Sequence, residues 1–255
     1  MTKRLSSNTL SSPNPRLRGQ VALVTGATRG IGLAIARALA TEGCNLILTA
    51  RDAPALTRVA NEFSRELGSA RIKVLAHLCD VRDPHSVDAL FRAARQQFKR
   101  LDILINNAGI AHPNLPIEKL PLPVWKDVLD TNLTGMFLVT QAALVVMKRG
   151  STIVNNLSIA ATRVFPSSAA YNASKHGALG LTNTLRAELR SRGIRVIALL
   201  PGATNTDIWT TLWPQAPRRK MMSAATVAEA VVQAILLPAN ATVETLEILP
   251  TVGTL

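Results

Sequence analysis

The chain alternates between short apolar runs and longer segments with the hydrophobic pattern of helices. The short runs are nearly continuous in apolar residues, which is typical of strands buried on both faces of a parallel sheet. We predict strands at residues 20–25, 45–50, 72–78, 102–105, 152–157, 195–200 and 243–249. The segments between them predict helices at residues 32–42, 55–67, 85–98, 124–147, 169–191 and 224–236.

Strands that alternate with helices predict an α/β fold, a doubly wound (Rossmann) seven-stranded parallel sheet with helices on both faces. A chain of 255 residues suits one such unit, and we find no internal repeat and no second core. Residues 1–18 are basic and rich in Ser, Asn and Pro, which predicts a flexible tail. We therefore expect a single Rossmann domain over residues 19–255.

The sequence contains no signal for export or for crossing a membrane. No apolar run reaches the roughly 18 residues of a membrane span, and the basic start lacks the apolar stretch of a secretory signal. These features predict a cytoplasmic protein. The start also resembles an organelle transit peptide, although two prolines disfavour an amphipathic helix there. Cys44 and Cys79 sit in or beside apolar runs and are interpreted as small buried hydrophobic residues.

The composition is strongly basic, with 29 Lys and Arg against 16 Asp and Glu and a formal net charge of +13. Nucleic acid, an acidic membrane surface or an anionic substrate carrier would each attract such a chain. The basic residues are scattered, and the aromatic residues, at 4%, are not interleaved with them, so stacking platforms for nucleic acid are not indicated. We expect a solvated cationic surface and neither a nucleic-acid nor a membrane partner.

A glycine-rich turn joins the first predicted strand to the first predicted helix. Glycine permits positive φ and removes the Cβ that would block a pyrophosphate, while the helix N-terminus offers unpaired N–H groups. A plain tight turn uses the same residues, but the strand, turn and helix context favours a dinucleotide site. The predicted cofactor-binding residues of this turn are Gly26, Thr28, Arg29, Gly30, Ile31 and Gly32.

The end of the second predicted strand indicates which dinucleotide binds. An acidic residue there would accept hydrogen bonds from a ribose 2′-hydroxyl, whereas an arginine suits a 2′-phosphate. The chain has Ala50 followed by Arg51, and Arg29 in the glycine turn is a second cation. The alternative is that Arg51 pairs with Asp52 or another surface acid. Two cations at one predicted pocket favour NADP(H) as the cofactor.

Two further segments follow predicted strands and are expected to line the same dinucleotide site. Asp80 and Val81 follow the third strand, where Asp80 is placed to accept from an adenine amino group; helix capping is the alternative for Asp80 or Asp83. The fourth strand ends in small residues that either let the backbone approach a cofactor or form a plain turn. The predicted cofactor contacts of these segments are Asp80, Val81, Asn107, Ala108 and Gly109.

Tyr171 and Lys175 are four residues apart on a predicted helix, so their side chains share one face. An adjacent ammonium is expected to lower the pKa of Tyr171, the only tyrosine, which makes the pair a candidate general acid and base. Such a pair is also common on helix surfaces. Ser158, at the end of the fifth strand, either hydrogen-bonds a substrate carbonyl or caps the strand. Asn132 offers an amide for a water beside Lys175, or bonds the backbone of its own helix.

These motifs, together with Pro201-Gly202, resemble the short-chain dehydrogenase/reductase family from Arg18 onward. The resemblance implies a catalytic tetrad in which Tyr171 is the acid in reduction and Ser158 positions the carbonyl. Lys175 would also hold the nicotinamide ribose, and Asn132 would complete a water relay. The predicted catalytic residues are Asn132, Ser158, Tyr171 and Lys175.

The resemblance also implies further contacts and an assembly. Tyr171 and Lys175 would contact the cofactor, and so would the segment after the sixth strand, at Pro201, Gly202, Thr204 and Thr206. The two long predicted helices, at residues 124–147 and 169–191, would build a dimer or a homotetramer. No metal site is expected.

Within the family the chain looks most like 3-oxoacyl-[acyl-carrier-protein] reductases. Arg149 and Arg192 fall where those enzymes place arginines that dock the acidic carrier protein. The short stretch between residues 206 and 224, with Trp209 and Trp213, and the ending of the chain look more like general carbonyl reductases. The two tryptophans would cover the substrate, or pack against the core.

The primary hypothesis is an NADP(H)-dependent oxidoreductase that interconverts a ketone or 3-oxoacyl group and a secondary alcohol, with Tyr171 as general acid and base. One alternative is a carbonyl reductase whose small substrate is unrelated to acyl-carrier thioesters. Another is a non-enzymatic NADP-binding redox sensor, which would have no need of Tyr171. A nucleic-acid-binding protein, motivated by the charge, would lose its affinity steeply with salt.

Overall fold

The computed structural model describes residues 15–66 and 72–254. Its centre is one sheet of parallel strands in the order β3-β2-β1-β4-β5-β6-β7. The strands are β1 (Val21–Thr25), β2 (Asn45–Ala50), β3 (Val74–Leu78), β4 (Leu101–Asn106), β5 (Met147–Asn156), β6 (Arg195–Pro201) and β7 (Thr245–Ile248). Successive strands are added on one side of β1 up to β3 and on its other side from β4 onward. Such a switch point between β1 and β4 opens a crevice at the carboxyl ends of the strands. The predicted seven-stranded, doubly wound fold is confirmed.

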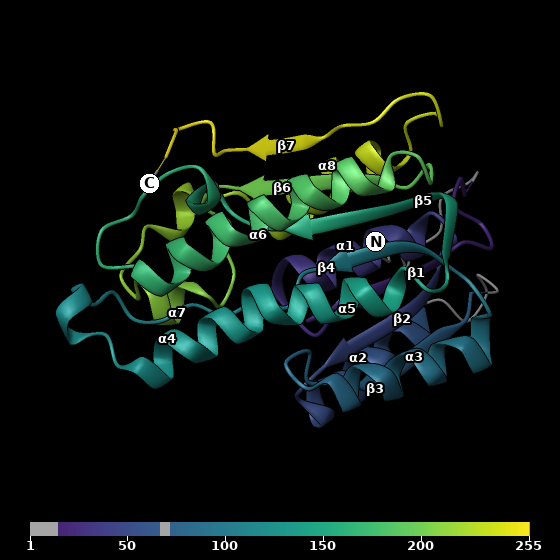
Figure 1. Ribbon diagram of the computed structural model, residues 1–255, viewed down its shortest axis with the longest axis horizontal. Coiled ribbons are helices and arrows are strands. Elements are labelled where there is room, and N and C mark those ends of the chain that lie inside the picture. Colours follow the sequence, from purple (N-terminus) through teal and green to yellow (C-terminus); the bar gives the residue numbers. More distant parts are fainter. Residues whose placement is uncertain (1–14, 67–71, 255) are drawn as a thin grey trace, which may run out of the picture.

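Helices cover both faces of the sheet (Figure 1). One layer contains α1 (Gly30–Thr41), α2 (Ala53–Glu66) and α8 (Ala224–Ile235). The other contains α3 (Pro84–Phe98), α5 (Gly135–Ala143) and α6 (Ala169–Leu189). Figure 1 shows α5 and α6 in front of the sheet, and α4 (Leu122–Leu129) and the short α7 (Trp209–Leu212) toward the end to which the strand arrows point.

Alternation along the strands divides the core between the two helix layers, because successive side chains of a strand point to opposite faces. Ala22 and Val24 of β1 belong to the core with α1 and α8, whereas Val21 and Leu23 belong to the core with α3, α5 and α6. Both faces are therefore apolar, as the near-continuous hydrophobic runs predicted.

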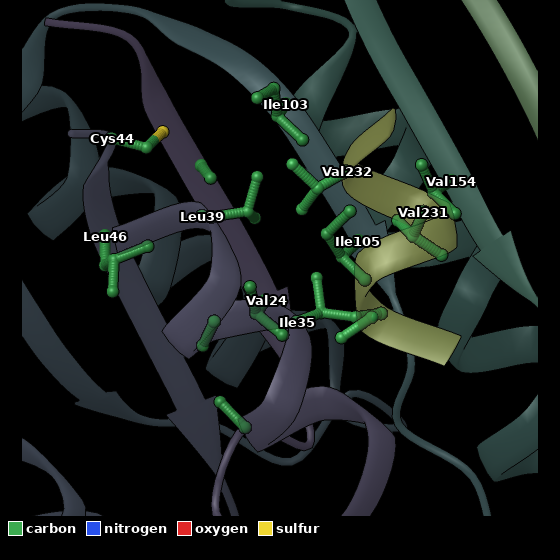
Figure 2. Close-up of a cluster of buried hydrophobic side chains, with 14 of the residues drawn as sticks. Val24, Ile35, Leu39, Cys44, Leu46, Ile103, Ile105, Val154, Val231 and Val232 are labelled. Carbon is green, nitrogen blue, oxygen red and sulfur yellow. The ribbon is translucent and has the colours of Figure 1, made fainter. Parts of the chain in front are cut away.

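Figure 2 shows the core beneath α1 and α8. Ile35 of α1 and Val231 of α8 are at most 1% exposed, and they pack in one cluster with Ile105 of β4. Removing a side chain of this size from water contributes about 1.5–3 kcal/mol. The packing fixes α1 against the sheet and thereby holds the glycine turn at the end of β1.

The predicted helix at residues 124–147 is wrong in its extent. The chain instead forms α4, a π-helical turn at Asp130–Thr134, and α5, which ends at Ala143. β5 then begins at Met147, earlier than the predicted strand at 152–157, and Met147 pairs with Leu101 of β4 beside a register shift. Apolar residues continue from α5 into β5, so only pairing with β4 reveals where the helix stops.

The predicted tail ended at residue 18, and residues 1–14 lie outside the described residues. Leu17 is buried in the core beneath α1, and its N–H donates to the Glu42 carbonyl at 2.9 Å. Arg16 forms an ion pair with the Glu42 carboxylate at 3.0 Å. Arg16 and Leu17 therefore belong to the packed unit.

Two further features of the described residues bear on function. None of the helices among them is long and apolar enough to cross a membrane, and none of their His, Cys, Asp and Glu side chains gather in threes as a metal site would require. Cys44 and Cys79 are buried free thiols, as predicted.

Candidate active site

A cleft of about 1130 Å³ lies at the carboxyl ends of the strands, where the switch point predicted a crevice. Most of the predicted site residues line it: Gly26, Thr28, Arg29, Gly30, Ile31, Arg51, Val81, Asn107, Ala108, Gly109, Ser158, Tyr171, Lys175, Pro201, Gly202, Thr204 and Thr206. Three predicted residues, Gly32, Asp80 and Asn132, are not in the lining.

The glycine turn has the backbone geometry that its sequence predicted. Gly26 and Gly30 have φ values of 62° and 57°, a region that favours glycine. Arg29 is the N-cap of α1 and makes no side-chain hydrogen bond to the cap, so no side chain of its own occupies the first N–H groups of the helix. The turn therefore presents a helix N-terminus to the cleft, which suits a pyrophosphate.

Gly32 serves packing rather than ligand contact. A Cβ at this position would lie 2.3 Å from Asn107 Nδ2 and 2.5 Å from the Gly26 carbonyl oxygen. Only glycine therefore lets α1 approach the end of β4 this closely.

Asn107 fixes the glycine turn to the sheet. Its Nδ2 donates to the carbonyls of Thr25 and Gly26 at 2.9 and 3.0 Å. The Thr25 hydroxyl in turn accepts from the backbone N–H groups of Asn107 and Ala108, both at 2.9 Å. These four bonds join the ends of β1 and β4, so the Asn-Asn-Ala-Gly segment shapes the cofactor turn as well as lining the cleft.

The end of β2 presents cations to the cleft. Arg51 is exposed and makes no ion pair within the described ranges, and Asp52 instead caps α2 by accepting from the Ala55 N–H at 2.9 Å. Arg29 lies 3.6 Å from Asp207, with both side chains largely exposed. Solvent weakens such a pair, so it leaves Arg29 available to an anion.

The adenine contact predicted for Asp80 stays a prediction, because this residue does not line the cleft in the described structure. The Asp80 carboxylate accepts from the Arg82 side chain, and this guanidinium holds the pKa of Asp80 below its usual value. The capping alternative belongs to Asp83, which accepts from the His85 and Ser86 N–H groups at the start of α3. Val81, between these two acids, is the residue that lines the cleft.

Tyr171 and Lys175 meet on one face of α6. Lys175 is 6% exposed, its Nζ donates to the Asn156 carbonyl at 3.1 Å, and it lies 5.5 Å from the centre of the Tyr171 ring. Burial lowers the pKa of Lys175 to about 8. Burial also raises the pKa of Tyr171, and hydrogen bonding with Ser158 acts in the opposite direction. The lowering of the Tyr171 pKa by Lys175 stays a prediction, while the net pKa of Tyr171 is raised because burial disfavours the phenolate.

Ser158 lies just beyond the end of β5, where it begins a short 3-10 turn. Its hydroxyl oxygen accepts from the Ala160 N–H at 3.1 Å, which leaves its own proton for Tyr171 or for a ligand in the cleft. The predicted capping role and the predicted ligand contact are thus compatible.

Asn132 lies in the π-helical turn and is 1% exposed. Its Oδ1 accepts from the Ile110 N–H at 2.8 Å, and its Nδ2 donates to the Ile110 carbonyl at 2.9 Å and to Ser174 Oγ at 3.0 Å. The amide predicted to hold a water is thus already used. It ties the segment after β4 to α6, a role that depends on elements far apart in the sequence.

Several residues that the sequence did not single out also line the cleft. They include Asn156 at the end of β5 and the apolar side chains of Ile110, Ile159, Phe165, Ile208 and Leu212. Two Asn residues at the end of an apolar strand were a visible signal for Asn156. Trp209 and Trp213 also line the cleft, and Trp209 Nε1 donates to the Thr204 carbonyl at 2.8 Å.

Arg149 and Arg192, the predicted carrier-docking residues, lie away from the cleft. Arg149 is near the start of β5 and Arg192 precedes β6, so both are at the amino ends of the strands. Arg192 donates to the Leu144 carbonyl at 2.9 Å, and Arg149 donates to the Ser191 carbonyl at 3.2 Å. Their guanidinium groups bond the backbone just after α5 and just after α6.

A helix N-terminus at a glycine turn, in one cleft with a half-buried tyrosine and a buried lysine, defines a nucleotide-binding oxidoreductase of the Rossmann fold. The sequence profile of the family described as "short chain dehydrogenase" matches residues 20–217. The chain belongs to this family, and the resemblance drawn from the sequence motifs is confirmed.

Individual relatives agree with this assignment. The chain is 39% identical over 199 residues to 3-oxoacyl-[acyl-carrier-protein] reductase from Synechocystis sp., which covers 77% of this chain and 78% of that protein. It is 35% identical over 242 residues to sulfoacetaldehyde reductase 2 from Chromohalobacter salexigens, covering 91% and 94%. The crystal structure of a short chain dehydrogenase from Burkholderia cenocepacia in complex with NADP has a TM-score of 0.83 at 32% identity, covering 91% of this chain and 97% of that one.

Proposed function

We propose that this protein is an NADP(H)-dependent oxidoreductase that interconverts a ketone and a secondary alcohol, with Tyr171 as general acid and base. The observation that carries the proposal is that Tyr171, Lys175 and Ser158 line the same cleft as the glycine turn. A protein that only binds a dinucleotide gains nothing from a buried amine beside a phenol, because burying an ionisable group lowers stability.

In the reductive direction, the Ser158 hydroxyl donates to the substrate carbonyl oxygen and Tyr171 gives that oxygen its phenol proton. The dinucleotide, when bound, supplies the hydride for the carbonyl carbon. Burial raises the pKa of Tyr171, so the phenol is protonated at neutral pH, as an acid must be.

Lys175 supports the proton transfer. Its ammonium stabilises the phenolate that Tyr171 leaves behind, since an opposite charge nearby favours the ionised form. Its pKa of about 8 lets it exchange its own proton with solvent close to neutral pH. The Asn156 carbonyl, 3.1 Å from Nζ, holds the amine in position.

Arg51 supports NADP(H) over NAD(H), because it is an exposed cation that lines the cleft and forms no salt bridge within the described ranges, although its charge helps to lower the pKa of Asp80. Loss of one charge-assisted hydrogen bond corresponds to about tenfold or more in affinity. We expect Arg51→Ala to weaken NADPH binding by about this factor and to change NADH binding little. Arg65→Ala, at an exposed arginine of α2 outside the cleft, is the matched control. An equal loss for both dinucleotides would contradict the 2′-phosphate role.

The lining of the cleft favours a small uncharged carbonyl compound over an acyl-carrier thioester. Phe165, Leu212 and Trp213 are apolar, and Arg149 and Arg192 lie at the opposite end of the strands. The two relatives named above reduce carbonyl groups, by their names, on an acyl carrier protein and on sulfoacetaldehyde respectively. We therefore propose the same reaction on a substrate without a large charged carrier.

The decisive assay follows NADPH oxidation at 340 nm against a panel of ketones, aldehydes and acetoacetyl-CoA, with NADH in parallel. We expect Tyr171→Phe to lower kcat by about 10²–10⁴-fold while NADPH binding is kept. Thr184→Val, on the exposed face of α6, controls for general effects on the helix. If the wild type binds NADPH, reduces no carbonyl and is unchanged by Tyr171→Phe, the redox-sensing alternative replaces the enzyme.

A further inference from the structure

The ends of β4 and β5 each carry two consecutive asparagines, Asn106-Asn107 and Asn155-Asn156. Asn106 and Asn155 are directly paired in the sheet register, so Asn107 and Asn156 are the next pair of neighbours along the two strands. Each pair is joined by a side-chain hydrogen bond of 2.8 Å, from Asn106 Nδ2 to Asn155 Oδ1 and from Asn156 Nδ2 to Asn107 Oδ1. Two chemically identical pairs therefore stand side by side on two strands.

The first pair is a buried structural network. Asn106 Nδ2 also donates to Thr140 of α5 at 2.8 Å, and Asn155 Nδ2 donates to Thr182 of α6 at 2.9 Å. Asn155 is 0% exposed and Asn106 is 3% exposed. This pair ties the sheet to the helices of one layer and does not line the cleft.

The second pair reaches the cleft. The carbonyls of Thr25 and Gly26 only accept, so Asn107 must turn its Nδ2 toward them and its Oδ1 toward Asn156. Asn156 must then present Nδ2 to Asn107, which leaves its own Oδ1 buried without a hydrogen-bond partner in the described structure. Asn106 Oδ1 of the first pair is likewise buried without a partner in the described structure, so the difference between the pairs is that Asn107 and Asn156 line the cleft and Asn106 and Asn155 do not.

Asn156 also touches the proton-transfer site through its backbone. Its carbonyl accepts from Lys175 Nζ at 3.1 Å. One residue thus holds the glycine turn through Asn107 and the catalytic amine directly. The bonds form a continuous path from the Gly26 carbonyl to Lys175.

We propose that Asn156 is a positioning residue that holds the dinucleotide turn and Lys175 at a fixed relative position, acting on the turn through Asn107. This inference rests on the proposed function in one respect, since it assigns the turn to a nicotinamide dinucleotide. The side chain of Asn156 contributes to cofactor binding without touching the pyrophosphate. Its backbone carbonyl fixes the position of Lys175 Nζ.

The test compares Asn156→Leu with Asn155→Leu, which change the same residue type to the same shape one position apart. NADPH binding is titrated by fluorescence, so that the result does not depend on turnover. We expect Asn156→Leu to weaken NADPH binding about fivefold, the equivalent of one hydrogen bond, with little change in thermal stability. Asn155→Leu is expected to lower thermal stability, because Asn106 and Thr182 lose a partner, and to leave the affinity for NADPH within about twofold.

A double-mutant cycle separates positioning from a general structural effect. If Asn156 acts through Asn107, then Asn156→Leu should add less than about twofold to the loss of affinity already caused by Asn107→Ala. Additive losses would overturn the proposed path. Asn156→Asp, which keeps the size but replaces the donor, provides the same comparison if the leucine variant does not fold.

The outcomes also distinguish this inference from the proposed function. If the wild type binds NADPH or NADH and Asn156→Leu and Asn156→Asp bind as tightly, the positioning role is overturned while the proposed function stands. If the wild type binds neither dinucleotide, both are overturned.

Discussion

The two sides of the cleft are built differently. On the cofactor side, the glycine turn is fixed by four hydrogen bonds between the ends of β1 and β4 and by the packing of α1 on a buried core. On the other side, α7 spans only Trp209–Leu212 and has no buried residue. The segment around it is held by a few bonds, among them Trp209 Nε1 to the Thr204 carbonyl and Arg218 to the Thr206 carbonyl.

This difference indicates how binding is divided within the cleft. Buried, fully bonded backbone holds one geometry, whereas an exposed segment with few contacts tolerates changes in sequence and shape. Under the proposed function, we expect the rigid side to hold the dinucleotide. We expect the segment around α7 to influence the choice of substrate.

The sharpest way to break the rigid side is Gly32→Ala. The added methyl group would lie 2.3 Å from Asn107 Nδ2 and 2.5 Å from the Gly26 carbonyl, and the carbonyl is backbone that cannot move alone. Overpacking of this kind costs about 1–3 kcal/mol, so we expect a lower melting temperature and dinucleotide binding weakened by tenfold or more.

Gly180→Ala on α6 is the control, because no atom outside the adjacent backbone of the helix lies within 4 Å of the place that its new methyl group would take, and alanine favours a helix. Unchanged dinucleotide binding in Gly32→Ala would show that the turn is less rigid than its contacts indicate.

Lys175→Met tests the buried ammonium of α6, which the Asn156 carbonyl joins to the rigid side. Burial lowers the pKa of Lys175 from 10.5 to about 8, so between these values the unfolded chain binds a proton that the folded chain does not. Wild-type stability from this group should therefore rise with pH from about 8 to about 10.5. At pH 7 the variant should be more stable by roughly 3 kcal/mol, less the loss of the bond to Asn156.

Urea unfolding of both proteins from pH 6 to pH 11 measures this difference. The extra stability of Lys175→Met over the wild type should shrink as the pH rises from about 8 to about 10.5. A difference that stays constant with pH would mean that Lys175 keeps its charge in the folded protein.

Trp213→Ala tests the loose side and should have the smallest effect on stability. Trp213 is 42% exposed and lines the cleft, so its removal should leave the melting temperature unchanged and raise KM for an apolar ketone a few-fold. The KM for NADPH should stay within about twofold. Leu237→Ala removes an exposed apolar side chain outside the cleft and should change neither constant. A large loss of stability in Trp213→Ala would assign this side chain to the core.

Sequence periodicity predicted an element most reliably where the local residues alone mark its start and its end. The run from β1 through the glycine turn into α1 was predicted closely, because both faces of β1 are apolar and the turn needs glycine at φ values near 60°. The segment from α4 to β5 was not, because Val145 and Val146 continue an apolar pattern that fits a helix or a strand. Pairing of Met147 with Leu101 decides between them, and that contact joins distant parts of the chain.

The candidate site divides in the same way. The sequence by itself determined the fold, the dinucleotide turn and the Tyr-Lys pair, since each depends on residues close together in the chain. Only the tertiary structure decided that Arg82 also bonds Asp127 of α4, that the Asn132 amide is already bonded, and that burial raises the pKa of Tyr171. Hydrogen-bond partners and desolvation depend on what other elements bring against a side chain, and local sequence does not record that.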